Sequence, residues 1–272
     1  MRGSGHPGAQ CVGRRPGGTA AAPDRRLWGG RGGRCAGHPG GPCRRRCEGG
    51  RPGGRADAAM TGAGIVEDAS PAVLGRVSDP AVGLALWRRD RFPGAALDPW
   101  LDALPADRLP RGRFLARLGD VDTALGPLLD GAGAPMALAA DIVDLSRRFL
   151  DVAGGEWVDL RLEVVQGDAC WKFHRDHVRL RLITTYRGPG TQVVAPIDAA
   201  RALAEQRRYQ GPLHEMPRHA VALFKGCGET GDDTSGAGIV HRSPPIAGTG
   251  QARLVLCLNL PSAASPEAWV PT

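Results

Sequence analysis

The sequence has no apolar run that approaches the roughly 20 residues needed to cross a membrane as a helix. Its first eight residues are rich in glycine and lack the apolar core of a secretory signal. These two absences lead us to expect a cytoplasmic protein with no membrane association. The chain has 272 residues, 42% of them hydrophobic, which is enough for packed cores in one or two domains of about 150 residues each.

Residues 1–59 almost lack valine, isoleucine and leucine, but hold 17 of the 40 glycines and six of the 23 prolines. Such a segment cannot bury enough apolar surface to offset the entropy lost on ordering, so we predict disorder. One interpretation is that the segment is a non-native extension and that the native protein begins at Met60. An Arg/Gly-rich RNA-binding tail is the alternative.

Lysine is also absent from residues 1–59, and twelve arginines against three acids give the segment a net charge of +9. The whole chain carries +7, so the remainder carries 7 − 9 = −2. The basic character therefore belongs to the first segment alone. The rest of the chain gives no electrostatic reason to expect nucleic acid as a partner.

The three cysteines beyond residue 59 form no C-x-x-C pair and suit a reducing compartment better than a disulfide framework; they are Cys170, Cys227 and Cys257. The first segment contains the spacing C-x2-H-x4-C-x3-C, from Cys35 to Cys47. That spacing is superficially similar to a zinc site, but no helix or strand pattern surrounds it. We therefore predict no zinc site there.

Residues 60–156 are predicted to be a mainly helical region. The clearest helix covers 136–153, where apolar residues recur at spacings of three and four, namely Leu138, Ile142, Leu145, Phe149 and Val152. Gly154-Gly155 is expected to end this helix. Residues 95–119 carry a helical pattern that Pro105 and Pro110 interrupt.

The pattern then changes to the alternation of β-strands. Strands are predicted at 157–166, 178–187, 191–195, 219–225, 238–241 and 253–260, with a short helix at 198–208 for which Asp198 is a possible N-cap. No βα repeat occurs, so a doubly wound parallel sheet is not expected. The sequence predicts an α+β fold, with an antiparallel jelly-roll or distorted barrel over 157–265 packed against N-terminal helices.

Four polar side chains of the strand region form a candidate site. His174 and Asp176 are two residues apart, His241 follows 65 residues after the aspartate, and Arg253 comes 12 residues later. Two imidazoles and a carboxylate can hold one face of an Fe(II) ion and leave the other positions open. An arginine can grip the far carboxylate of a small dicarboxylic co-substrate.

Strand alternation supports this hypothesis. His174 and Asp176 share parity with Leu180, so we expect them to face the same interior. Arg253 shares parity with Val255, and a charge that points inward is costly unless an anion meets it. His177 would point away from His174 and is a weaker ligand candidate.

The segment from Leu160 to Leu260 resembles a bacterial family known as domain of unknown function 1826. The matching pieces are Arg161-Leu162-Glu163, Asp168-Ala169-Cys170, Phe173-His174-Arg175-Asp176, Thr185 to Gln192, Phe224-Lys225-Gly226 and His241-Arg242-Ser243-Pro244-Pro245. The His-x-Asp…His…Arg order is similar to that of the 2-oxoglutarate/Fe(II)-dependent dioxygenase superfamily, whose core is a double-stranded β-helix of eight strands. About six strands are evident in this sequence.

The resemblance to the dioxygenases implies an Fe(II)/2-oxoglutarate-dependent hydroxylase. Fe(II) would be held by His174, Asp176 and His241, and the far carboxylate of 2-oxoglutarate by Arg253. Many of these enzymes have Ser or Thr two residues after the arginine, where this chain has Val255. Thr184 or Tyr186 is the expected source of the missing hydroxyl. The resemblance also suggests that the glycine-rich stretch 226–238 is a mobile lid.

Other classes of function stay open. The same triad could serve a non-catalytic metal-binding or metal-homeostasis protein, with zinc and help from His177 or Cys170. Alternatively, Asp176 and Arg253 could form an internal ion pair in a structural β-domain. For an enzyme, the substrate would be a small molecule or a peptide that the sequence does not identify.

Overall fold

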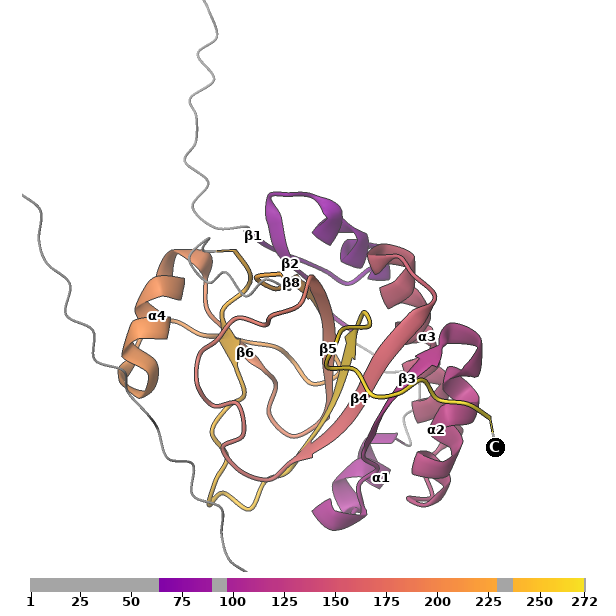
Figure 1. The fold of residues 1–272 in the computed structure, drawn as a ribbon. Helices are drawn as coiled ribbons and strands as arrows, with labels where there is room; N and C mark the ends of the chain where they lie inside the picture. Colours follow the sequence, from indigo (N-terminus) through magenta and orange to yellow (C-terminus); the bar gives the residue numbers. More distant parts are fainter. Residues whose placement is uncertain (1–63, 90–96, 229–236, 272) are drawn as a thin grey trace, which may run out of the picture. The chain divides into compact units, whose positions relative to one another are not determined.

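The computed structural model describes residues 64–89, 97–228 and 237–271 (Figure 1). The predicted disorder of 1–59 lies outside these residues, as does most of the predicted lid at 226–238. The described residues form ten strands: β1 Gly64–Asp68, β2 Val82–Trp87, β3 Gly112–Arg117, β4 Trp157–Val165, β5 Leu180–Arg187, β6 Gln192–Val193, β7 His214–Glu215, β8 Val221–Lys225, β9 His241–Arg242 and β10 Arg253–Asn259.

The described helices are α1 Leu97–Ala103, α2 Val121–Asp130, α3 Met136–Ala153 and α4 Ala199–Glu205, with short 3-10 turns at Pro71–Ser78, Ala106–Arg108, Leu118–Asp120, Pro196–Asp198 and Gln206–Arg208. Helix α3 has the predicted bounds, and it ends where Gly154 adopts a positive φ of 76° that a glycine tolerates without strain. Asp198 lies at the predicted N-cap position of α4, but its side chain caps no backbone N–H.

The strands form two sheets. The main sheet has the order β1-β2-β8-β5-β10-β4-β3, and the small sheet has the order β7-β6-β9. All pairs are antiparallel except β1 with β2. An isolated antiparallel bridge from His174 to His241 adds a fourth segment to the small sheet, next to β9.

The chain from β4 onward passes repeatedly between the two sheets. The main sheet takes β4, β5, β8 and β10, whereas the small sheet takes the His174 segment, β6, β7 and β9. These eight segments form an antiparallel jelly-roll core, which confirms the predicted fold class. The sequence had revealed only six of them, because β7 has two residues and the His174 segment pairs through a single bridge.

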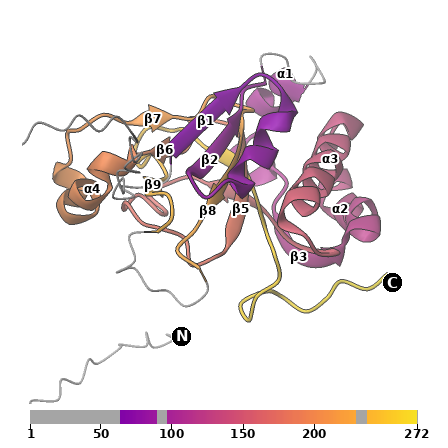
Figure 2. The ribbon, with the colours of Figure 1, turned by 90° about the horizontal axis from the view of Figure 1, so that it is seen from above.

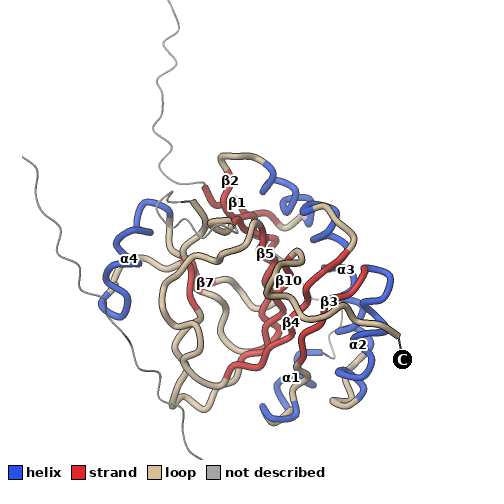
Figure 3. The backbone as a smooth tube through the Cα atoms, in the orientation of Figure 1, coloured by secondary structure: helices blue, strands red, loops and turns tan. Residues whose placement is uncertain are grey.

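Helices cover the outer faces of both sheets. Helices α2 and α3 lie against the main sheet and α4 lies beyond the small sheet (Figures 2 and 3). Three clusters of buried side chains fill the layers. The largest joins α2 and α3 to the outward face of the main sheet, the second lies between the sheets, and the third packs α4 against the small sheet. The candidate site belongs to the middle layer.

Besides helices α1, α2 and α3, the N-terminal region contains three strands that were not predicted, since β1, β2 and β3 extend both edges of the main sheet. Strand β2 is a run of six residues of which five are buried. Such a run fits a strand covered on both faces, since it shows no alternation. In the part of the chain that the structure describes, no helix is long and apolar enough to span a membrane.

Candidate metal centre

The two candidate histidines lie side by side on adjacent backbone segments. The amide of His174 donates to the carbonyl of His241 at 3.0 Å, and the amide of His241 donates to the carbonyl of His174 at 3.1 Å. The imidazole rings are 4.6 Å apart between centroids, and the ring of Phe224 packs 4.9 Å from that of His241. Residues 67 positions apart in the sequence (241 − 174) are thus held as a cross-strand pair.

The contact of each Nδ1 atom with a backbone carbonyl fixes the tautomer of each imidazole ring. Nδ1 of His174 lies 2.8 Å from the carbonyl oxygen of Lys172, and Nδ1 of His241 lies 3.1 Å from that of Ile239. A carbonyl oxygen only accepts hydrogen bonds, so each Nδ1 must carry the hydrogen. In the neutral rings, both Nε2 atoms then present lone pairs, which is the arrangement of metal-ligating histidines supported by backbone carbonyls.

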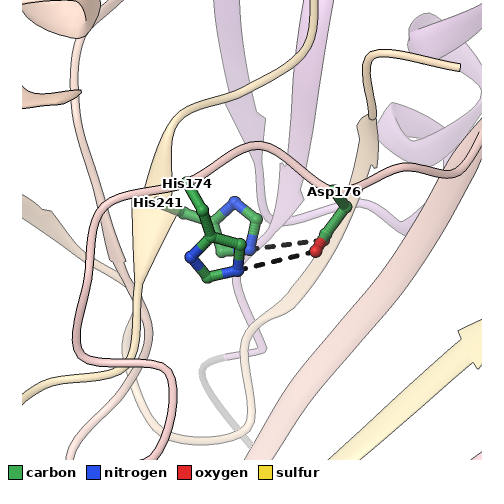
Figure 4. Close-up of side chains that lie close together, drawn as sticks. All are labelled: His174, Asp176 and His241. Atoms are coloured by element: carbon green, nitrogen blue, oxygen red, sulfur yellow. Dashed lines mark ion pairs between the residues drawn. The ribbon is translucent and has the colours of Figure 1, made fainter. Parts of the chain in front are cut away.

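Both Nε2 atoms point toward the Asp176 carboxylate (Figure 4). Nε2 of His174 is 3.6 Å from Oδ1 and Nε2 of His241 is 3.3 Å from Oδ2. Lone pairs that face a carboxylate repel it unless a proton or a metal ion lies between them. One ligand atom from each of the three residues can be chosen so that all lie within 4.8 Å of one another, a separation that a single ion can bridge.

The two oxygens of Asp176 have different surroundings. Oδ1 is 2.7 Å from a terminal nitrogen of Arg181, whose Nε donates to Oδ1 of Asn259 at 2.8 Å. Oδ2 is buried and accepts no hydrogen bond from the part of the chain that the structure describes. A buried oxygen without a donor is costly, and a cation between it and the two imidazoles would remove that cost.

The protonation of the carboxylate fits this arrangement. Burial by itself would raise the pKa of Asp176, but the two histidines and the charge of Arg181 outweigh it and hold that pKa well below its usual range. Burial would also lower the pKa of His174, but the nearby negative charge of Asp176 and the hydrogen bond to the Lys172 carbonyl leave it raised. Asp176 is therefore ionised, as a ligand must be.

Arg253 is an almost fully buried cation, with 1% of its surface exposed. Its Nε donates to the carbonyl of Pro189 at 2.7 Å. Its terminal nitrogens donate to the hydroxyls of Ser243 at 2.6 Å, Thr191 at 3.0 Å and Thr185 at 3.4 Å. Among the described residues, no carboxylate lies within ion-pairing distance of it. Burial lowers the pKa of Arg253 to about 10, so the group is still charged at neutral pH.

Both histidines and Arg253 line one narrow cavity of about 50 Å³ between the sheets, and Asp176 ion-pairs with another of its lining residues, Arg181. Its walls include the inward row of β10, with Val255 and Cys257 after the arginine, and an Arg161–Glu163 ion pair of 2.6 Å on β4. An almost fully buried arginine that has no counterion among the described residues and donates to three hydroxyls is suited to receive an anion.

Thr184 and Tyr186 do not reach this cavity, contrary to the role expected for them. They face the helices, where the Tyr186 hydroxyl donates to Asp141 at 2.7 Å and Thr184 accepts from Arg89 at 3.5 Å. Strand β5 alternates, so its opposite face carries Thr185, which contacts Arg253. Thr185 is therefore the hydroxyl of β5 that lies at the cavity.

The parity argument for His174 and Asp176 was also wrong. Leu180 and Leu182 belong to the cluster under the helices, and the cavity is lined by Arg181 and Ile183 instead. The chain crosses from the small sheet to the main sheet between positions 174 and 180, through a segment of bends rather than a strand. Alternation cannot be counted across such a crossing.

Other candidates are placed as follows. His177 is exposed and is not part of the triad. The suggested ion pair between Asp176 and Arg253 is absent, since the arginine that pairs with Asp176 is Arg181. Sequence reasoning overlooked Arg181, although a cation within the apolar pattern of a predicted strand was a signal that could have found it.

The chain belongs to the family described as "Protein of unknown function (DUF1826)", whose family model matches residues 68–259. The resemblance noted in the sequence is thereby confirmed. A search of curated proteins finds no match.

Solved structures with a similar backbone include a dioxygenase for auxin oxidation from rice, with 12% identity, 75% of this chain and 86% of that chain covered, and a TM-score of 0.42. The 2-oxoglutarate complex of the Arabidopsis thaliana enzyme has 12% identity, coverage of 76% and 96%, and a TM-score of 0.40. The Kdo hydroxylase, described as a non-heme Fe(II) alphaketoglutarate-dependent dioxygenase, has 10% identity, coverage of 72% and 89%, and a TM-score of 0.41. At these values no activity carries over to this chain.

Proposed function

We propose that the protein is an Fe(II)- and 2-oxoglutarate-dependent oxygenase of the hydroxylase type. The observation that supports this most directly is the pair of imidazole Nε2 atoms converging on one buried carboxylate, whose Oδ2 accepts no hydrogen bond from the described residues. Two neutral imidazoles and one carboxylate are the donor set that non-heme Fe(II) oxygenases use. His174, Asp176 and His241 would hold the metal.

Arg253 supports the co-substrate part of the proposal. Along β10 the inward row runs from Arg253 through Val255 and Cys257 to Asn259, which is hydrogen-bonded to Arg181 beside Asp176. Because His174, His241 and Arg253 line the same cavity, a dicarboxylate bound there would have one end near the triad and the other at Arg253.

The chain's own groups would bind and orient the reactants. The guanidinium of Arg253 and the hydroxyls of Ser243, Thr191 and Thr185 would hold the far carboxylate, while Val255 and Cys257 would exclude water from its methylene groups. Bound Fe(II) would supply the activation of O2, with 2-oxoglutarate oxidised to succinate and CO2 while one oxygen atom enters a substrate C–H bond.

The cavity must widen before it can hold 2-oxoglutarate. About 50 Å³ is the space of one or two water molecules, so a five-carbon dicarboxylate needs further room. The Arg161 and Glu163 side chains are 42% and 38% exposed and can turn toward solvent at little cost, since exposed ion pairs contribute about 0–1 kcal/mol.

The same narrowness favours the second candidate function, a metal-binding protein without catalysis. Its metal could be zinc, which accepts imidazole and carboxylate ligands. If the protein is an oxygenase, we propose that its substrate is a small molecule or a peptide. This substrate would enter the cavity past the half-exposed Arg161–Glu163 pair.

Anaerobic titration with Fe(II), followed by 2-oxoglutarate, tests the proposal. We expect a visible metal-to-ligand charge-transfer band that appears only when both are present. The band should be lost in His174→Ala through loss of the metal and in Arg253→Met through loss of the co-substrate. Metal binding that 2-oxoglutarate leaves unchanged would refute the oxygenase and leave the metal-binding protein. Absence of metal binding would refute both.

A further inference from the structure

Arg181 is the feature of the site that a simple metal triad does not require. It lies on the inward face of β5, and its register partner across β10 is Asn259. The Asn259 side chain accepts from Nε at 2.8 Å, which leaves a terminal nitrogen 2.7 Å from Oδ1 of Asp176. The guanidinium is thus fixed at both ends, with 23% of the side chain exposed.

Because of this contact, the two carboxylate oxygens of Asp176 have different roles. Oδ1 is taken by a charged donor, and Oδ2 is left beside His241 with no hydrogen bond from the described residues. A carboxylate can bind a metal through one oxygen or through both. Here the second mode would require Oδ1 to leave a charge-assisted hydrogen bond, which is among the stronger contacts available.

The same contact places a permanent positive charge beside the metal position. Asp176 and Arg181 together carry no net charge, so a divalent ion would meet a carboxylate ligand that is already paired with a cation. Arg253 and the Arg161–Glu163 pair add a further net positive charge to the same cavity. Like charges that share one cavity repel strongly when they are partly shielded from water. The site is therefore electrostatically poor for a bare cation and better for a cation that arrives with an anionic chelator.

We infer that Arg181 is a positioning residue that restricts Asp176 to one ligand oxygen and weakens the hold of the site on a bare divalent ion. Metal retention would then depend on an anionic co-ligand such as 2-oxoglutarate, which provides regulation at the site itself. This inference rests on the proposed metal site, but not on catalysis.

Two opposite outcomes separate this role from a merely structural one. Loss of an ordinary outer partner of a metal ligand loosens the metal by about 10–100-fold, because the ligand loses its orientation. Loss of Arg181 should instead tighten the metal, because a repulsive charge is removed and Oδ1 becomes free to coordinate. The sign of the change in affinity is therefore diagnostic.

The experiment is calorimetric titration of the full chain with Mn2+ alone, for the wild type and for Arg181→Met, Arg181→Lys and Arg161→Met. We expect at least tenfold tighter binding in Arg181→Met and near-wild-type affinity in Arg181→Lys, which keeps the charge and a donor. Arg161→Met removes the same charge from the same cavity without touching Asp176, and should change the affinity by a smaller factor.

Infrared difference spectra of the Mn2+-bound and metal-free proteins give the second readout. The separation of the two carboxylate stretching bands of Asp176 should be wide in the wild type, as for one coordinating oxygen, and narrow in Arg181→Met. Weaker Mn2+ binding in Arg181→Met, or equal tightening in Arg161→Met, would overturn the inference. If the wild type binds no Mn2+ at all, the proposed metal site fails instead. Thermal melts of each variant identify any loss of folding.

Discussion

Replacing Arg253 by methionine should remove 2-oxoglutarate binding and leave the stability of the metal-free protein almost unchanged. The lowering of the Arg253 pKa from 12.5 to about 10, in which burial outweighs nearby negative charge, corresponds to a net cost of about 3 kcal/mol for holding the charge there. Hydrogen bonds to one carbonyl and three hydroxyls return about 1 kcal/mol each. The two contributions nearly cancel, so we expect a change of at most about 2 kcal/mol in the free energy of unfolding.

Binding of the co-substrate should respond far more strongly. A carboxylate held by the fork of Arg253 would lose two charge-assisted hydrogen bonds in the variant, at about 1.5–3 kcal/mol each. A loss of about 3–6 kcal/mol weakens affinity by roughly 10²- to 10⁴-fold. Affinity for the metal alone should change much less. Arg253 begins the inward row of β10, whereas Arg181, which contacts Asp176, pairs with Asn259 at the other end of that row.

The assay is calorimetric titration of the Mn2+-loaded protein with 2-oxoglutarate, alongside urea unfolding of the metal-free protein. Thr185→Val and Thr184→Val form a matched pair of controls. The first removes a hydroxyl that contacts Arg253 and should weaken binding, whereas the second lies on the helix-facing side of β5 and should not. The reasoning is refuted if Arg253→Met retains its affinity for 2-oxoglutarate, or if it unfolds with a loss above about 5 kcal/mol, as a purely structural buried arginine would.

Three other outcomes can be checked directly. His241→Ala should weaken Mn2+ binding by more than the ~10–100-fold typical of an outer partner with little change in the melting temperature, since its backbone bridge survives; unchanged affinity would remove it from the ligand set. Asp141→Asn, which breaks a buried ion pair with Arg89 of 2.5 Å, should cost about 3–5 kcal/mol in urea unfolding without altering metal affinity, and a variant as stable as the wild type would contradict this. Iodoacetamide should modify the exposed Cys170 much faster than Cys257, whose pKa burial raises, and metal with 2-oxoglutarate should slow the reaction at Cys170; mass-spectrometric peptide mapping that finds equal rates would disprove the assigned burial.

The sequence predicted those elements whose pattern is continuous. Helix 136–153 was found with its observed bounds, because a single apolar stripe and two glycines determine it. The triad and Arg253 were found from residue type and order, and the structure brings the triad together.

What the sequence did not reveal depends on where the chain changes sheets. Parity carried from Asp176 to Leu180 failed, because the intervening residues are bends and not a strand. The same uncertainty led to Thr184 in place of Thr185. Arg181 gains its role only through register with Asn259, a pairing between distant segments that no local pattern contains.

The backbone pairing of His174 with His241 determines whether folding would depend on metal binding. The entropy of closing the 67-residue loop between the two ligands (241 − 174) is lost when the sheets form and not when an ion arrives. A chelator should therefore strip the site without melting the fold, unlike the zinc fingers that unfold when their metal leaves. The newly synthesised protein would then fold without metal. Which ion it binds would depend on the local concentrations of metal ions and on the chelator that delivers them.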